Sequence, residues 1–163
     1  MLFRSGSWGV CAQRGNAHSA ATSAVLMCIL SHYSTIRSGA ILSGADRNQP
    51  DTPLWLVAVR AAESKKATEI KVLDLTGVTS FTDCFVVCTG ANARQIQAIT
   101  EEIGLKLKEH GEFPISMEGY NQAEWVLVDY GDFLVHIFSP RSRAYYDLER
   151  LWRNARNVEI PAA

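Results

Sequence analysis

Residues 125–138 read WVLVDYGDFLVHIF and carry the strongest local pattern in the chain. Two apolar runs flank Tyr130-Gly131, and apolar runs on both sides of a two-residue turn predict a β-hairpin. With that turn, Trp125 lies opposite His136 and Leu127 lies opposite Leu134. Successive side chains of a strand point to opposite faces, so the hairpin has two faces of different character.

One face of the hairpin is apolar and should pack beneath helices; it carries Val126, Val128, Phe133, Val135 and Ile137. The other face carries Trp125, Leu127, Leu134, His136 and Phe138, with Asp129 and Asp132 at the turn end. Large aromatic side chains mixed with polar ones are typical of surfaces where a partner docks. The alternative is that a further helix, such as the C-terminal one, covers this second face. A slip of one residue in the pairing would exchange the faces.

Two more strands and a long helix precede the hairpin. Residues 69–75 and 84–88 are alternating or apolar runs that stop near Gly77 and Gly90, which predicts strands. Asn92 can cap a helix that ends at His110-Gly111. The buried side of that helix should be formed by apolar residues spaced three or four apart, namely Ile96, Ile99, Ile103 and Leu107.

The remaining pattern completes a single α/β domain. Asp51 or Thr52 can cap a first helix with Pro53 at its first position. Residues 114–117 suit a short edge strand, and residues 143–153 have a helical pattern built on Tyr146, Leu148, Leu151 and Trp152. The predicted order is α-β-β-α-β-β-β-α, with the domain over residues 51–157 and a tail over residues 158–163.

Residues 1–50 differ in composition from the rest of the chain. They are rich in Ser, Ala and Gly, and four arginines against Asp46 alone give them a net charge of +3. A leader with Arg and Ser and almost no acidic residues resembles an organelle transit peptide. Because its arginines are sparse and lie on no clear amphipathic face, we favour an unstructured extension.

The charge of residues 51–163 bears on the class of partner. They hold 12 basic and 16 acidic side chains, a net charge of −4. Gripping nucleic-acid phosphates calls for a clustered basic face, so this acidic domain suits a basic protein partner better. The apolar run over residues 24–30 is too short for a membrane span, which needs about 20 apolar residues.

Neither cysteines nor histidines form a metal-binding pattern. Cys84 and Cys88 would lie about 13 Å apart along a strand, too far to share a zinc ion, so we expect both to be buried small hydrophobes. Cys11 and Cys28 lie in the leader, and the four cysteines do not suggest a disulfide framework. We therefore expect no metal, no cofactor and a reducing compartment.

Two features could carry catalysis, and both are weak. Residues 89–94 (TGANAR) follow a strand and open a helix, where backbone N–H groups can hold a phosphate, but they lack the P-loop and dinucleotide glycine patterns. We favour an ordinary helix cap. Asp83, Asp129, Asp132 and His136 could form an acid/base set, but no nucleophile motif accompanies them, so we expect no enzyme activity.

Five segments in register resemble the ribosomal silencing factor (Iojap) family. They are TDCFVVCTG at 82–90, EG at 118–119, AEWVLVDYGD at 123–132, VH at 135–136 and YYDLERLW at 145–152. The match covers about residues 53–153 without large gaps. It implies a mixed sheet of about five strands flanked by helices, like nucleotidyltransferases but without their catalytic residues.

The resemblance also implies a function. Members of this family bind large-subunit ribosomal protein fourteen, prevent the small subunit from docking, and so repress translation when nutrients are scarce. Organelle relatives act in large-subunit assembly. The alternatives to a silencing factor are therefore a nucleotidyltransferase-like enzyme or an assembly factor in an organelle.

We expect the ribosomal protein to bind the second face of the hairpin and the C-terminal helix. The predicted partner-binding residues are Trp125, Leu127, Asp129, Leu134, His136, Tyr146, Glu149 and Trp152. The expected protein is a monomer or weak homodimer that makes no sequence-specific nucleic-acid or membrane contact. We expect it in the cytoplasm, or in a mitochondrion or plastid if the leader is a transit peptide.

Overall fold

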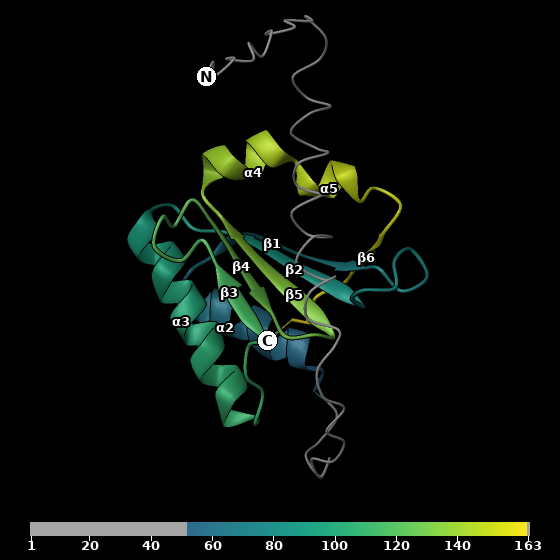
Figure 1. Cartoon of the computed structure of the whole chain (residues 1–163), viewed down its shortest axis with the longest axis horizontal. Helices are drawn as coiled ribbons and strands as arrows, with labels where there is room; N and C mark the ends of the chain where they lie inside the picture. Colours follow the sequence, from purple (N-terminus) through teal and green to yellow (C-terminus); the bar gives the residue numbers. More distant parts are fainter. Residues whose placement is uncertain (1–51, 163) are drawn as a thin grey trace, which may run out of the picture. The chain divides into compact units, whose positions relative to one another are not determined.

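A computed structural model describes residues 52–162, which form one α/β domain (Figure 1). The sheet has six strands: β1 Thr68–Asp74, β2 Cys84–Thr89, β3 Ser116–Glu118, β4 Trp125–Asp129, β5 Phe133–Phe138 and β6 Arg156–Val158. Their order across the sheet is β3-β4-β5-β2-β1-β6. The pair β2–β5 is parallel and the other pairs are antiparallel, so the sheet is mixed, as predicted.

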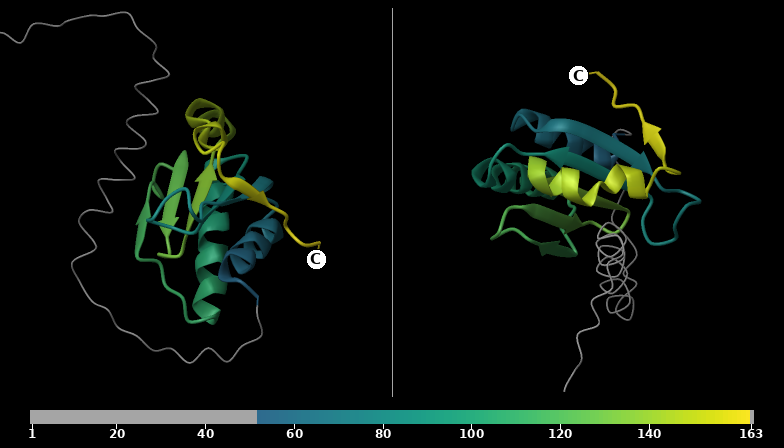
Figure 2. Two further views of the ribbon diagram at one scale, coloured as in Figure 1. Left: turned by 90° about the vertical axis from the view of Figure 1, so that its right-hand side faces the viewer. Right: turned by 90° about the horizontal axis from the view of Figure 1, so that it is seen from above.

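Helices cover the two faces of the sheet unequally. The long helices α2 (Leu54–Ser64) and α3 (Ala93–Glu109) pack on one face, and the short helices α4 (Pro140–Tyr146) and α5 (Leu148–Leu151) lie over the other (Figures 1 and 2). None of these helices has the length and apolarity to span a bilayer. The predicted partner-binding residues Trp125 and Leu127 lie on the face with the short helices.

The core lies between the sheet and the two long helices. The predicted apolar face of the hairpin is buried there, together with the four predicted positions of α3, whose exposed fractions are all 0%. Burying a branched aliphatic or aromatic side chain contributes about 1.5–3 kcal/mol to the stability of the folded state. This layer therefore supplies most of the hydrophobic stabilisation of the domain. Cys84 and Cys88 are buried in the same sheet, as predicted.

Helix α3 begins and ends where the sequence indicates. The side chain of Asn92 accepts a hydrogen bond from the Gln95 N–H at 2.9 Å, and His110 follows the last helical residue. Gly111 has a positive φ of 80°, which a glycine adopts without strain. Helix α2 departs from the prediction, because Pro53 itself is the N-cap and, among the described residues, no side chain caps the helix; Asp51 lies outside those residues.

The hairpin has the predicted faces but a different register. Trp125 pairs with Phe138, and Leu127 pairs with His136, because the two turn residues are Gly131 and Asp132 and not Tyr130 and Gly131. The Tyr130 N–H donates to the Phe133 carbonyl at 3.1 Å and closes this turn. The pairing predicted for Trp125 with His136 is therefore wrong. It is displaced by two positions, and since side chains alternate with a period of two, each residue stays on its predicted face.

The C-terminal region contains a break and a strand that the sequence pattern does not reveal. The predicted continuous helix is interrupted at Asp147, whose φ of 44° and ψ of 56° are left-handed, so two short helices form. Strand β6 then pairs with β1, and the Arg156 guanidinium donates to the Asp74 carboxylate at 2.7 Å. The domain thus continues past the predicted boundary at residue 157, with Val158 and Ile160 packed against the core.

Gly119 joins β3 to β4 through a contact that excludes any side chain. Its φ is +75°, and a Cβ atom there would lie 1.9 Å from the backbone oxygen of Trp125. Relief of that clash would move the start of β4, and we expect Gly119→Ala to lower the free energy of unfolding by about 3 kcal/mol or more. Chemical denaturation measures this loss.

Gly104→Ala is the matched control, because a Cβ atom there meets nothing within 4 Å and the residue lies inside α3. Alanine is favoured over glycine in a helix by about 1 kcal/mol, so this variant should be more stable than the parent. Equal effects of the two substitutions would contradict the assigned contact.

Candidate partner-binding surface

Four aromatic rings form a ladder from the core to the surface. Phe138 of β5 stacks on Trp125 of β4 with ring centroids 5.1 Å apart, and Trp125 meets Tyr146 of α4 at 4.8 Å. Tyr145 stands edge-on to Tyr146 at 5.0 Å. Phe138 is fully buried, Trp125 and Tyr146 are half-buried, and Tyr145 is 64% exposed. These four residues, the aromatic ladder, hold a surface ring in a position set by the core.

The start of α4 is tied to the start of β4. Ser139, the N-cap of α4, donates its N–H to the Glu124 carbonyl at 2.9 Å and its hydroxyl to the Glu124 carboxylate at 2.7 Å. The Ser142 hydroxyl also donates to that carboxylate, at 3.2 Å. Because Glu124 directly precedes Trp125, these bonds fix Tyr146 relative to the tryptophan.

Arg143 anchors the same helix to the sheet from below. One guanidinium nitrogen donates to the Glu69 carbonyl and to the Thr89 hydroxyl, each at 2.7 Å, and Nε donates to the Glu149 carboxylate at 3.1 Å. Arg143 is buried, and the Glu149 side chain is only 20% exposed. Partial burial alone would raise the pKa of Glu149, but the hydrogen bonds from Arg143 outweigh it and hold the pKa below its ordinary value. We call this arrangement the Arg143 clamp.

His136 lies beneath the ladder and is fully buried. Its Nδ1 accepts the indole N–H of Trp125 at 3.3 Å, so the imidazole is neutral with its proton on Nε2. Its ring packs edge-on against Phe85, with centroids 4.7 Å apart. Desolvation lowers the pKa of His136 to about 3. The contacts of this imidazole with Trp125 and Phe85 serve packing and orientation.

Helix α5 covers the middle of this face. Trp152 packs edge-on to Phe85, with centroids 5.6 Å apart, and Leu148 is buried. The predicted cover by a C-terminal helix is therefore present over only part of the second face. The short helices cover β5 and β2, whereas Trp125 and Leu127 of β4 stay half-exposed beside the exposed ring of Tyr145.

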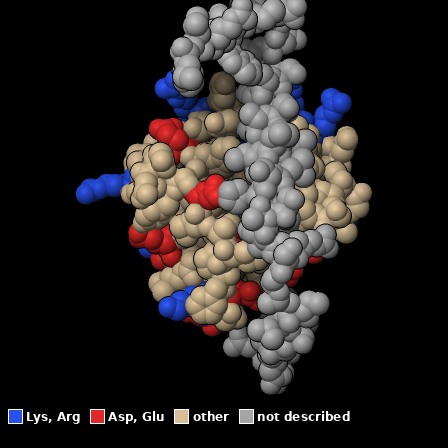
Figure 3. Space-filling model, in the orientation of Figure 1, with Lys and Arg blue, Asp and Glu red and all other residues tan. Residues whose placement is uncertain are grey.

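The β3–β4–β5 half of the domain is acidic. Residues 109–140 contain no Lys or Arg and six acidic residues: Glu109, Glu112, Glu118, Glu124, Asp129 and Asp132. We call residues 109–140 the acidic segment. On the face shown in Figure 3, the Lys and Arg side chains of the described residues stand mostly at the margin and form no continuous patch. Such a surface favours a basic protein partner over nucleic acid.

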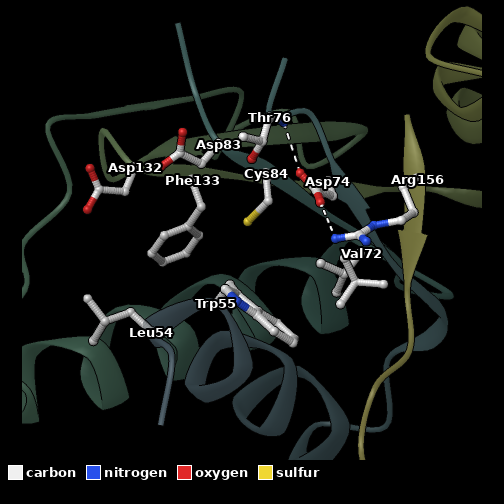
Figure 4. Close-up of a pocket in the computed structure, with 11 residues that line it drawn as sticks. Leu54, Trp55, Val72, Asp74, Thr76, Asp83, Cys84, Asp132, Phe133 and Arg156 are labelled. Atoms are coloured by element: carbon white, nitrogen blue, oxygen red, sulfur yellow. Dashed lines mark hydrogen bonds and ion pairs between the residues drawn. The ribbon is translucent and has the colours of Figure 1, made fainter. Parts of the chain in front are cut away.

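Of the residues considered for catalysis, Asp83 and Asp132 line one cavity, whereas Asp129 and His136 are not among its lining residues. A cavity of about 420 Å³ between α2 and the sheet is lined by Asp74, Asp83 and Asp132, with Phe133 and Trp55 on opposite walls (Figure 4). Asp74 is paired with Arg156, and Asp83 and Asp132 lie at the rim. Asp129 lies elsewhere. Within residues 52–162 no three His, Cys, Asp or Glu side chains are placed to hold one metal ion.

The loop over residues 89–94 uses its backbone donors internally. The Ala91 N–H donates to the Gln95 amide oxygen at 2.8 Å, and the Gly90 N–H donates to the Phe138 carbonyl at 2.9 Å. With Asn92 as the cap, this is the ordinary helix start predicted above, and it offers no cluster of donors to a phosphate. Cys88 beneath it is unreactive, since burial raises its pKa to about 12.

Comparison with known proteins assigns this architecture to a family. Residues 48–163 match the family described as "Ribosomal silencing factor during starvation". That match spans well over half of the chain. The chain belongs to the ribosomal silencing factor family.

Similar proteins in this family come from bacteria and from an organelle. A "Ribosomal silencing factor RsfS" of Halalkalibacterium halodurans is 42% identical over 107 residues, which are 66% of this chain and 92% of that protein. A solved structure from Chromobacterium violaceum has a TM-score of 0.60 and 36% identity, covering 68% of this chain and 91% of that one. The mouse "Mitochondrial assembly of ribosomal large subunit protein 1" is 28% identical over 98 residues, 58% of this chain and 42% of its own length.

Several residues predicted to bind a partner of this silencing-factor domain make contacts within the domain. Leu134 and His136 are buried, so they support the surface without forming it. Asp129 is buried and accepts the Gly131 N–H at 2.7 Å, and Glu149 belongs to the Arg143 clamp.

Trp125, Leu127, Tyr146 and Trp152 are half-buried and lie on one face of this silencing-factor domain, as the alternation predicts. The prediction omitted Tyr145, the most exposed ring of the ladder. Its position beside Tyr146 in the YYDLERLW segment was the available signal.

The Arg143 clamp should contribute strongly to stability. Glu149→Ala leaves a buried guanidinium without its carboxylate, and breaking a buried pair in this way costs about 3 kcal/mol or more. The control is Glu63→Ala, which breaks the exposed Arg60–Glu63 pair and should cost less than about 1 kcal/mol. Urea denaturation compares them; similar small losses would refute the clamp.

Burial of His136 should make stability pH-dependent. The unfolded chain binds a proton near the ordinary pKa of 6.5, whereas the folded chain does so only near 3. Unfolding therefore takes up a proton between these values, and stability falls as pH falls, by about 2 kcal/mol from pH 6.5 to pH 5. His136→Leu should flatten this slope, whereas substitution of the exposed His110 by Gln should keep it. An unchanged slope in His136→Leu would contradict the neutral buried imidazole.

Proposed function

We propose that this protein is a non-enzymatic repressor that binds the large ribosomal subunit through its protein fourteen and sterically blocks the small subunit. The observation that carries the proposal is the aromatic ladder on the half-covered face of a domain in the silencing-factor family. A steric blocker needs a rigid domain, an anchor patch and bulk. It needs no reaction centre.

The ladder has the properties of an anchor patch. Tyr and Trp are enriched among the residues that dominate binding energy, especially where their neighbours hold them in place. Tyr145 and Tyr146 lie on a helix fixed at one end by Ser139 and Glu124 and in its middle by Arg143. Little conformational entropy is then lost when a partner covers the exposed ring.

Charge supports the same class of partner. The acidic segment includes β3, β4 and β5, so a basic ribosomal protein would be steered towards this side of the domain. Asp129 and Glu149 act within the fold, so the attraction rests on the exposed members of the segment, such as Asp132 and Glu124. The proposal includes the cytoplasm as the site of action, with an organelle as the alternative if residues 1–50 act as a transit peptide.

A second candidate function is large-subunit assembly. The name of the similar mouse protein refers to assembly of the mitochondrial large ribosomal subunit. Both functions use a surface of the large subunit. They differ in timing, because an assembly factor acts on an immature subunit and a repressor acts on a mature one. Depletion that lowers the amount of mature large subunits would favour assembly, whereas normal amounts with increased subunit joining would favour repression.

Tyr145→Ala tests the docking surface without disturbing the core. The ring is mostly exposed, so the free energy of unfolding should change by less than about 1 kcal/mol. The binding free energy for large subunits should weaken by about 2 kcal/mol, which is roughly a thirtyfold loss of affinity. Co-sedimentation of the pure protein with isolated large subunits measures the loss. Inhibition of cell-free translation should fall in parallel.

Leu105→Ala is the matched control, because Leu105 is 53% exposed on α3, on the other side of the sheet. It should bind and inhibit like the parent. Trp125→Ala is less informative, since it also removes contacts with Phe138, Tyr146 and His136 and should cost stability. Wild-type binding by a folded Tyr145→Ala protein would exclude the ladder from the proposed mechanism.

A further inference from the structure

Strand β3 is an outer strand of the sheet, and an exposed apolar row runs from the residues before it into the strand. Phe113, Ile115 and Met117 occupy every second position and are 62%, 54% and 42% exposed. We call these three residues the apolar row. In the described part of the chain β4 is the strand that pairs with β3, and no strand lies on its other side.

Such an edge is unusual because folded proteins generally protect their outer strands. They use short strands, prolines or lysines to prevent another chain from pairing there. Here Pro114 and the three-residue length of β3 limit the pairing, but residues 109–140 supply no Lys or Arg. Three large apolar side chains beside an outer strand form a site for an added strand, whose alternate side chains would cover them.

We propose that β3 and the apolar row bind an extended segment of a basic protein by strand addition. The apolar side chains of that segment would cover Phe113 and Met117, and its Lys or Arg side chains would face the acidic segment. This inference rests on the edge and its charge, and it does not depend on the identity of the ribosomal partner.

Charge argues against a second copy of this chain as the occupant. Pairing two β3 strands would bring together two acidic segments, each with six carboxylates and no Lys or Arg. Like charges opposite each other destabilise a strand pair. A segment with alternating apolar and basic residues satisfies both the exposed apolar area and the negative field.

The row is separate from the aromatic ladder. Met117 pairs with Val128, whose side chain faces the α2 and α3 core, whereas Trp125 and Leu127 point to the opposite face of the sheet. One partner could thus add a strand at β3 while another contacts the ladder, or a single protein could engage both sides of this edge.

The test is a titration of the ¹⁵N-labelled full-length protein with a peptide of alternating Val and Lys, about six residues long, the usual length of a strand. We expect saturable shifts of the amide signals of residues 113–118 and slower hydrogen exchange in β3. A peptide with Glu in place of Lys should bind at least about tenfold more weakly. Equal binding of the two peptides would overturn the assignment to a basic partner.

A double variant and its control decide whether the row is the site. Phe113→Ser with Met117→Ser should weaken the Val-Lys peptide at least about tenfold, whereas Val78→Ser with Leu105→Ser, also at exposed positions, should not. Tyr145→Ala should keep peptide binding, which separates this result from the test of the ladder. No response of β3 to the peptide, or a dimer dissociated by the double variant, would overturn the proposal.

Discussion

Burial of the Arg143 guanidinium is the constraint on which the functional face depends. A charged group can leave water only where hydrogen bonds and an opposite charge replace its hydration. Here the replacements come from three separate places: the Glu69 carbonyl, the Thr89 hydroxyl and the Glu149 carboxylate. The residues that satisfy Arg143 therefore also determine where α4 and α5 lie.

The local backbone of β1 is adapted to this arrangement. Glu69 has a positive φ of 49°, and the pairing of β1 with β2 slips between Thr68 and Lys71. Its carbonyl accepts a hydrogen bond from Arg143 at this irregular point of the sheet. A regular ladder would use strand carbonyls for pairing between strands, so the irregularity coincides with the group that accepts from α4.

The parts of the fold that follow a repeated pattern could be predicted from the sequence. The spacing of Ile96, Ile99 and Ile103 fixes the buried side of α3, and strict alternation fixes the two faces of the hairpin. The pairing register could not be predicted, because it depends on which two residues form the turn. The assignment of residues to the two faces was still correct, because the register differs by two positions. A difference of one position would have exchanged core and surface residues.

Two C-terminal features lacked a local signal. Asp147 sits between two segments of helical pattern, and its left-handed backbone is imposed by the contacts of Arg143 and Leu148 on either side of it. Strand β6 is three residues long, and it forms because β1 offers an unpaired edge to which Arg156 is attracted by Asp74. Sequence periodicity does not predict contacts of this kind, which join residues far apart in the chain.

The limited size of α4 and α5 explains why the aromatic ladder reaches the surface. Six strands spaced about 4.8 Å apart make a sheet roughly 24 Å wide, whereas one helix layer is about 10 Å across. The short helices cover β2 and β5, where Phe85, His136 and Phe138 are buried, and they stop short of β4. Trp125 lies at that boundary, with one side against Phe138 and its upper side against Tyr146. A third layer long enough to cover β3 and β4 would bury the ladder and leave no anchor, so half-coverage of the sheet is what makes this face available to a partner.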